Sequence, residues 1–212
     1  MNNIIKDYNI RYVKKVYYCN YLNNNCNTYN KVWNAKIIKN NNSNRTSPKW
    51  VKWVHRSLSN NHCEECLKLD GCWFLKFNAP KHPHHPFCHC VLEDILYNDV
   101  LTKSSSNSAY SKFDPYLFNT EGKYPHNKEK LFESWGYTVE DSKWLQMEIE
   151  KQGLEKYVNG EYELGKLDYN GQRLSIRVEI PRKDQLSKVS FTTGWMLYPN
   201  GKIQLATPYG GK

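Results

Sequence analysis

Residues 160–180, "GEYELGKLDYNGQRLSIRVEI", decide the fold class of this chain. Apolar and polar residues alternate on both sides of Asn170-Gly171, and Asn-Gly is the strongest short signal for a two-residue β-hairpin turn. The same pattern recurs in residues 189–209, around Asn200-Gly201. The sequence therefore predicts an antiparallel sheet of about four strands near its C-terminal end.

Two helices are predicted before this sheet. The first covers residues 127–137, where Gly136 stands at a position typical of a helix C-terminus. The second covers residues 138–154, and Thr138 with Asp141 has the spacing of a capping box. Helices followed by an antiparallel sheet predict the α+β class.

The rest of the chain is expected to be organised around a linker. The stretch from Thr102 to Asp114 is rich in serine and poor in apolar residues, which is typical of linkers. Before it, residues 49–59 place Trp50 and Trp53 at helical spacing, so a short helix is predicted there. The predicted division is a basic arm at 1–48, a small module at 49–101, a linker at 102–112 and an α+β domain at 113–212.

Charge is unevenly distributed along the chain. Residues 1–60 carry eleven Lys or Arg against one acid and hold fifteen Asn, whereas residues 113–212 carry fourteen bases and fourteen acids. A basic, Asn-rich arm suits contact with nucleic acid or an acidic protein, although solvated loops have the same composition. No apolar run reaches the about 18–20 residues of a membrane span, and no signal peptide is recognised at the start. We expect a protein of the cytoplasm or of a virion.

Soft metal ligands are concentrated between His62 and Cys90. This stretch holds five of the seven cysteines and five of the seven histidines of the chain. In a reducing cytoplasm such a cluster favours a metal site over disulfides. Tetrahedral zinc takes four N or S ligands, commonly two from a CxxC turn and two from a second turn. The sequence predicts a structural zinc site with these candidate ligands: Cys63, Cys66, His85, Cys88 and Cys90.

The fourth ligand stays open at this point. Cys63, Cys66 and Cys88 are favoured, with either His85 or Cys90 completing the site, while the other histidines of the stretch are interpreted as bystanders. A disulfide pair in an oxidising environment is one alternative. A catalytic metal of the HNH nuclease type is another, but it requires an acid–base histidine with a partner that the spacing does not show.

His126 is the only histidine after His89 and the candidate acid–base residue of the C-terminal half. It precedes the first predicted helix and stands near Lys123, Lys128 and Lys130, so it could serve phosphodiester cleavage at an anion site. The alternative is an exposed histidine in a lysine-rich turn. On the last strands, hydroxyls of Thr193 and Thr207 could bind phosphate and Tyr209 could stack on a base, although Thr and Tyr are also good strand formers.

Part of the chain resembles a known family of phage proteins. Cys63-Glu-Glu-Cys66, Leu69-Asp70-Gly71 and the HPxCxC run from His85 to Cys90 resemble the signature of phage head morphogenesis proteins, the minor head family named after protein F of phage Mu. The resemblance covers residues about 44–95. It implies a minor virion component that contacts portal or capsid proteins, and it implies that a toxin or nuclease domain can follow.

Residues 113–212 resemble a second group. The run "GKYPHNKEKLFESWGY", a tryptophan on the penultimate strand and a final Thr-Pro are similar to the barnase–EndoU–colicin–RelE group of nuclease folds. This resemblance implies a metal-independent ribonuclease in which the 2′-hydroxyl attacks the adjacent phosphorus. It assigns His126 as acid–base group and Lys128 as phosphate clamp. It further implies that Arg177 or Arg182, with Thr193 and Thr207, would line the sheet.

Three functions remain open from the sequence. The first is a phage or prophage minor head protein with a zinc-stapled module and a ribonuclease-like domain that binds RNA. The second has the same architecture without catalysis and contacts portal, capsid or packaged DNA. The third is a prophage-encoded toxin or effector, which would have an acidic neutralising partner. RNA cleavage that is lost on His126→Ala separates the first from the second.

Overall fold

A computed structural model describes residues 48–56, 63–183 and 186–210. These residues form a mixed α+β fold with few helices and two sheets, so the predicted fold class is confirmed. The basic arm predicted for residues 1–48 lies almost wholly outside the described residues. Among the helices described, none has the length and apolar content that crossing a membrane requires.

Two hairpins form most of the larger sheet, as the Asn-Gly turns predict. One joins β5 (Glu163–Asp168) to β6 (Gly171–Pro181), and the other joins β7 (Lys188–Tyr198) to β8 (Lys202–Thr207). Both turns need a left-handed backbone, because φ is 120° at Gly171 and 62° at Asn200. The strand order in this sheet is β4-β8-β7-β6-β5.

The fifth strand corrects the prediction of a four-stranded sheet. Strand β4 (Ser105–Asn107) pairs in parallel with β8 and lies within the predicted linker, between helix α4 (Tyr97–Lys103) and the 3₁₀ turn η2 (Tyr110–Lys112). Ser106 on this strand also ties it to helix α6, because its hydroxyl donates a hydrogen bond to the carbonyl of Glu150 at 2.8 Å. Residues 102–112 are therefore an ordered part of the fold.

Both predicted helices are present. The first is α5 (Lys128–Glu133), and the chain leaves it through Gly136 with φ at 86°. The second is α6 (Ser142–Val158), and the predicted capping box forms just before it, where the Thr138 N–H donates to Asp141 Oδ2 at 2.9 Å.

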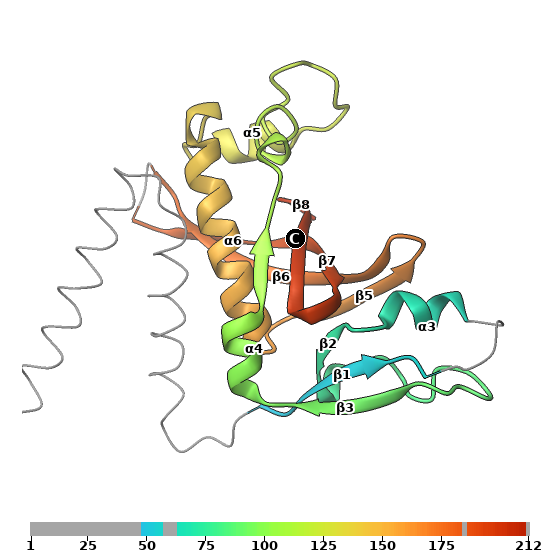
Figure 1. Cartoon of the computed structure of the whole chain (residues 1–212). Helices are drawn as coiled ribbons and strands as arrows, with labels where there is room; N and C mark the ends of the chain where they lie inside the picture. Colours follow the sequence, from blue (N-terminus) through green and yellow to red (C-terminus); the bar gives the residue numbers. More distant parts are fainter. Residues whose placement is uncertain (1–47, 57–62, 184–185, 211–212) are drawn as a thin grey trace, which may run out of the picture. The chain divides into compact units, whose positions relative to one another are not determined.

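Helix α6 lies across one face of the larger sheet, as Figure 1 shows. The helix and the sheet come close at Gly153, because a Cβ at this position would stand 2.4 Å from Cζ2 of Trp195 on β7. Leu145 and Ile149 from the helix and Ile176 from β6 are fully buried in this region. The core of the C-terminal half is thus a helix-on-sheet layer.

The smaller sheet corrects the prediction of a helix at 49–59. Residues Trp50–Val54 form β1, the central strand of the order β2-β1-β3, between β2 (Trp73–Leu75) and β3 (Val91–Ile95). Trp50, Val51 and Trp53 are all fully buried. A central strand covered on both faces loses the polar alternation of a half-exposed strand, and its apolar spacing then looks helical.

The two sheets belong to one compact unit that starts at Pro48. The Tyr157 hydroxyl on α6 donates to the carbonyl of Trp73 at 2.8 Å, and the Leu75 N–H donates to the Tyr162 hydroxyl at 2.9 Å. Trp50 packs edge-on against Tyr157, with ring centroids 5.2 Å apart. The predicted boundary between a separate module and a C-terminal domain is therefore not a structural boundary.

Candidate functional site

The first candidate site is built by helix α3 (Glu64–Leu69) and the loop that leads into β3. Cys63 is the residue before the helix and Cys66 is buried in its first turn, so a CxxC spacing puts both thiols on one side. Cys88 and Cys90 come from the loop opposite. Phe87 adopts φ of 61°, and the Cys88 N–H donates to the carbonyl of His85 at 3.2 Å, which closes the turn between these two candidate ligands.

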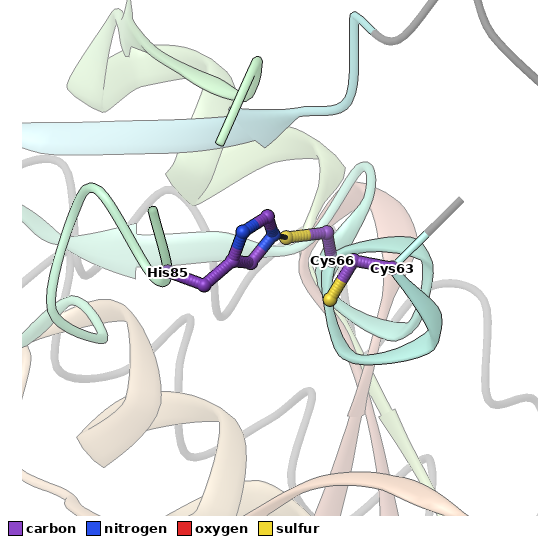
Figure 2. Close-up of side chains that lie close together, drawn as sticks. All are labelled: Cys63, Cys66 and His85. Carbon is purple, nitrogen blue, oxygen red and sulfur yellow. Dashed lines mark hydrogen bonds between the residues drawn. The ribbon is translucent and has the colours of Figure 1, made fainter. Parts of the chain in front are cut away.

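The five predicted ligands converge on Cys66. One group consists of Cys63, Cys66 and His85, and the other of Cys66, Cys88 and Cys90; within each group the ligand atoms lie within 4.8 Å of one another. Figure 2 shows the imidazole of His85 pointing toward the cysteines at the start of α3. These residues can hold a metal ion.

The distances inside the cluster suit tetrahedral zinc. Cys66 Sγ lies 3.8 Å from Cys88 Sγ and 3.3 Å from His85 Nε2. Zinc bonds are about 2.3 Å long to sulfur and about 2.0 Å long to nitrogen. Tetrahedral angles then place two sulfur ligands about 3.8 Å apart, and a sulfur and a nitrogen ligand about 3.5 Å apart. All five described cysteines are free thiols, Cys72 included.

Hydrogen bonds separate the ligand histidine from its neighbours. His85 Nδ1 lies 2.7 Å from the carbonyl of Pro86, which fixes the proton on Nδ1 and leaves the Nε2 lone pair facing Cys66. His84 Nε2 instead contacts Glu65 Oε2 at 2.7 Å, and His82 Nε2 contacts the carbonyl of Cys90 at 2.8 Å. The interpretation of His82 and His84 as bystanders agrees with these contacts.

Without a bound cation, burial and the close contacts among the thiols shift the pKa values of the cysteines in this cluster. Burial is the largest cause that raises the pKa of Cys66, and hydrogen bonds with the thiols of Cys90, Cys63 and Cys88 raise it further. Burial also acts to raise the pKa of Cys88, but hydrogen bonds from the backbone at His84 and Cys90 outweigh it and set this pKa at about 6. A bound cation would stabilise every thiolate at once.

The second candidate site surrounds His126, just before α5. Its Nδ1 lies 3.2 Å from Glu129 Oε2 and 3.4 Å from the backbone N–H of Lys128. The carboxylate contact is shorter and charge-assisted, which favours the tautomer with the proton on Nδ1. His126 Nε2 is buried and has no hydrogen-bond partner among the described residues. In that tautomer Nε2 carries a lone pair that can accept a proton.

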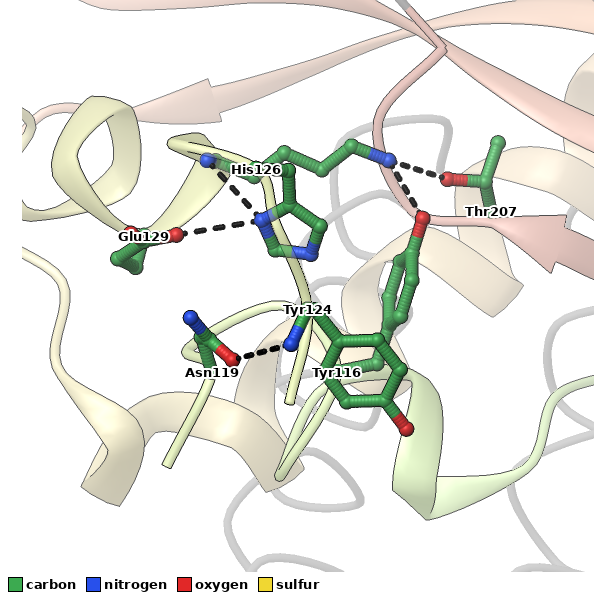
Figure 3. A network of polar contacts seen from close by, with 7 residues as sticks. Tyr116, Asn119, Tyr124, His126, Glu129 and Thr207 are labelled. Atoms are coloured by element: carbon green, nitrogen blue, oxygen red, sulfur yellow. Dashed lines mark hydrogen bonds and ion pairs between the residues drawn. The ribbon is translucent and has the colours of Figure 1, made fainter. Parts of the chain in front are cut away.

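Lys128 joins this histidine turn to the end of the sheet. Its ammonium group donates to the Tyr116 hydroxyl at 2.7 Å and to Thr207 Oγ1 at 3.1 Å, as Figure 3 shows. Thr207 Oγ1 in turn donates to the carbonyl of Tyr209 at 2.9 Å. Burial acts to raise the pKa of Tyr116, but the hydrogen bond from Lys128 and further polar contacts outweigh it, and the net pKa is lowered. Tyr116 is therefore a more acidic phenol than an exposed tyrosine.

Two tyrosine rings enclose the imidazole. The Tyr116 ring meets the His126 ring edge-on with centroids 4.9 Å apart, and the Tyr124 ring is stacked against it at 5.9 Å. Asn119 Oδ1 accepts from the Tyr124 N–H at 3.0 Å and fixes the loop that carries this ring. A phenol, an imidazole, an ammonium and a hydroxyl thus meet within one network, which is a set of groups that can transfer protons and bind an anion.

A family model described as a domain of unknown function, DUF6883, matches residues 90–212, more than half of the chain. The chain belongs to the DUF6883 family. No curated protein and no solved structure matches the chain. The DUF6883 match contains the whole His126 network, but of the five candidate metal ligands it contains only Cys90. The candidate metal centre therefore joins the DUF6883 region to the preceding α3 segment.

Three predicted catalytic residues of the DUF6883 region, His126, Lys128 and Thr207, are brought together by the fold. The helix that follows His126 is α5, which has six residues, and the anion site expected at its N-terminus stays a prediction. Tyr209 contributes its carbonyl to the network, and its ring packs on Phe191 with centroids 6.0 Å apart rather than standing free.

Other predicted residues of the DUF6883 region are not part of the network. Thr193 is fully buried, donates to the carbonyl of Ile176 at 2.8 Å and accepts from the Trp195 indole at 2.7 Å, so its role is structural. Arg177, one position after Ile176 on β6, faces the opposite side of the sheet and bonds Ser190 Oγ at 2.6 Å.

The predicted lysines near His126 differ in their surroundings. Lys123 is exposed and ion-paired with Glu121 at 2.7 Å, which neutralises its charge locally. Lys130 is exposed on α5, and Arg182 follows β6, where its N–H donates to the carbonyl of Ser187. Among the contacts found for the described residues, neither Lys130 nor Arg182 joins the His126 network.

Sequence reasoning missed Tyr116, Tyr124 and Glu129. The position of Glu129, three residues after His126, could have indicated a partner on the same helical face. Tyr116 gives no local signal, because the fold brings it to Lys128 from a separate loop.

Proposed function

We propose that this protein is a metal-independent ribonuclease whose fold is stapled by a structural zinc ion. The observation that carries the proposal is the His126 network, in which Glu129 orients the imidazole and Lys128 links Tyr116 to Thr207. The order of elements, helices followed by an antiparallel sheet, supports it. So does the resemblance of residues 113–212 to the barnase–EndoU–colicin–RelE group.

The chemistry is cleavage of RNA by its own 2′-hydroxyl. His126 Nε2 accepts the proton of the 2′-hydroxyl as the oxygen attacks phosphorus, and the Tyr116 hydroxyl gives its proton to the departing 5′-oxygen. The O–H bond at O2′ and the P–O5′ bond break, while the O2′–P and O5′–H bonds form. The products are a 2′,3′-cyclic phosphate and a 5′-hydroxyl. The Lys128 ammonium stabilises the negative charge that develops on the non-bridging phosphate oxygens.

Access to the histidine requires a side-chain movement. His126 Nε2 is buried, and the rings of Tyr116 and Tyr124 are its aromatic neighbours. RNA reaches Nε2 when one tyrosine ring turns aside, and an unpaired base can then stack on that ring.

The zinc ion in this proposal has a structural role. Four of the five ligands around Cys66 would hold it, which closes the coordination sphere and leaves no position for a substrate. The ion would tie α3 to the loop before β3, and β3 pairs with the central strand β1. Elemental analysis of the purified protein, expected to give one zinc per chain, tests this part.

RNA cleavage in the presence of EDTA tests the catalytic part. Wild-type protein is incubated with a single-stranded RNA and with DNA of the same sequence, beside the His126→Ala variant. Cleavage of RNA alone, with cyclic phosphate ends, and a loss of about 10²–10⁴-fold in the variant are expected. Matching melting temperatures and zinc contents show that the variant is folded. An RNA that stays intact with folded, zinc-loaded wild type refutes the ribonuclease.

A non-catalytic virion role is the second candidate. The convergence of Cys63-Glu-Glu-Cys66 with the HPxCxC run at one centre favours it, because that motif resembles the phage minor head family. Under this proposal the protein resides in a virion or in the bacterial cytoplasm and contacts portal, capsid or packaged DNA. Co-purification with portal or capsid proteins, together with no RNA cleavage, would support it. A toxin role would instead yield an acidic partner that blocks cleavage.

A further inference from the structure

A second ammonium group faces the phenol of Tyr116. Lys112 ends the 3₁₀ turn η2, and its Nζ lies 5.8 Å from the centroid of the Tyr116 ring. Lys128 Nζ lies 4.7 Å from the same centroid and reaches it from α5. Both lysines are half-buried. Two cations from separate elements therefore converge on one aromatic ring beside His126.

No carboxylate of the described ranges neutralises this pair. The salt bridges found there involve neither Lys112 nor Lys128. The nearest acid in the network, Glu129, faces His126, and Asp114 accepts a hydrogen bond from the Thr120 hydroxyl at 2.7 Å. Attraction to the ring face helps to hold each ammonium group but leaves both charges in place. Two positive charges beside the same ring, with no carboxylate paired to either among the described residues, favour the approach of an anion.

Several hydrogen-bond donors of this pair have no acceptor among the described residues. An ammonium group has three N–H donors. Lys128 uses two of them, on Tyr116 and Thr207, and no hydrogen bond of the Lys112 ammonium is found within residues 48–56, 63–183 and 186–210. Thr207 already donates to Tyr209. The group that completes this arrangement has several acceptor oxygens and a negative charge, which describes a phosphate.

We propose that Lys112 and Lys128 together bind one backbone phosphate of a single-stranded polynucleotide beside His126. This inference rests on the proposed function, because it names the substrate contact of the same site. A single strand fits because its unstacked bases can stack on the rings of Tyr116 and Tyr124, which are both half-buried. Lys112 is thus a binding residue, and the proton transfers remain with His126 and Tyr116.

The test uses a ligand that the protein cannot cleave. A fluorescein-labelled oligodeoxythymidylate lacks the 2′-hydroxyl, and its binding to the full chain is followed by fluorescence anisotropy at several salt concentrations. Lys112→Ala is expected to weaken binding several-fold at low salt and to reduce the slope of log K against log[salt] by about 0.7, the loss of one phosphate contact. Lys112→Arg should restore the slope.

The matched control is Lys103→Ala, which removes the same charge from α4. Lys103 is exposed and already paired with Asp99 at 3.0 Å, so its loss should leave affinity and slope close to wild type. Equal losses in Lys112→Ala and Lys103→Ala would overturn the proposal, because they would report net charge alone. Binding of inorganic phosphate without binding of the oligonucleotide would overturn it as well. A lowered slope in Lys112→Ala, with RNA left intact by wild type, would keep the phosphate site and reject the ribonuclease.

Discussion

The carboxylate of Glu129 lies 3.2 Å from Nδ1 of His126, and the two side chains are equally shielded, each 17% exposed. His126 lies just before α5 and Glu129 lies in its first turn, so a separation of three residues brings the two side chains together. This contact favours the proton on Nδ1, so that Nε2 keeps its lone pair at a buried position with no hydrogen-bond partner among the described residues. Glu129 is a positioning residue in the proposed ribonuclease.

Glu129→Gln should lower the rate of RNA cleavage about 10- to 100-fold, because the amide keeps the shape of the side chain but cannot stabilise the charged imidazole. The affinity for uncleavable DNA should stay unchanged, since Glu129 does not face the two lysines. Single-turnover cleavage and anisotropy measure the two quantities. Glu133→Gln, an exposed change on the same helix, is the control. A Glu129→Gln variant that binds DNA more weakly and cleaves at the wild-type rate would contradict the positioning role.

Cys66→Ser should remove the metal and destabilise the fold, because Cys66 belongs to both candidate ligand groups. Loss of a structural metal costs several kcal/mol, which corresponds to a fall of about 10 °C in melting temperature for a chain of this size. Zinc content and thermal unfolding measure the effect. The control is Cys72→Ala: this thiol is fully buried outside both groups, so its loss should cost stability and leave zinc content intact. Full zinc loading of Cys66→Ser would contradict the assignment.

Gly153→Ala should destabilise the protein by about 2–4 kcal/mol, although alanine is the better helix former by about 1 kcal/mol. The added Cβ would stand 2.4 Å from the Trp195 ring, so α6 must move away from the sheet. Urea denaturation measures the change. Met147→Ala, at an exposed position of the same helix, should be nearly neutral. Equal stability of Gly153→Ala and wild type would show that the helix and the sheet are less closely packed than the structure indicates.

The parts of the fold that the sequence could predict are those with local signals. Asn170-Gly171 and Asn200-Gly201 each specify a turn by themselves, and the Thr138–Asp141 box specifies a helix start within four residues. Strand β4 has no such signal, because it is defined by pairing with β8, about a hundred residues later in the chain. Its serine-rich sequence is typical of a linker, and only the structure shows that Ser106 donates to the carbonyl of Glu150 on α6.

The candidate sites also contain some residues that a local sequence signal reveals and others that only the fold brings together. The candidate metal ligands follow from spacing alone, since CxxC and HPxCxC place thiols on short turns. His126 and Lys128 were found because they are neighbours in sequence. Tyr116 could not be found, because only the fold brings its hydroxyl within 2.7 Å of Lys128 Nζ. Thr193 was assigned wrongly, because a threonine on a strand gives no sign of which face it occupies until the register is known.

Glu150 on α6 provides a test of pH dependence. Burial raises the pKa of its carboxyl, although hydrogen bonds such as that from the Ser108 hydroxyl, 2.6 Å from Oε1, act to lower it. Because the folded pKa lies above the unfolded one, the folded state binds the proton more tightly. The carboxylate therefore costs stability at pH values above the folded pKa, and this cost disappears as the pH falls below the unfolded pKa.

Glu150→Gln should accordingly stabilise the protein at neutral pH, since the amide removes the buried charge and keeps an oxygen that accepts from Ser108. The advantage of the variant over wild type should shrink as the pH is lowered, because the wild-type side chain becomes neutral too. Urea unfolding of both proteins at a series of pH values gives this difference directly, and effects of pH on the metal centre cancel in it. Glu140→Gln, at an exposed position just before α6, is the control for the loss of one surface carboxylate. If Glu150→Gln were less stable than wild type at neutral pH, the Ser108 contact would outweigh burial, and the carboxylate would be a net stabilising contact between α6 and the residue that follows β4.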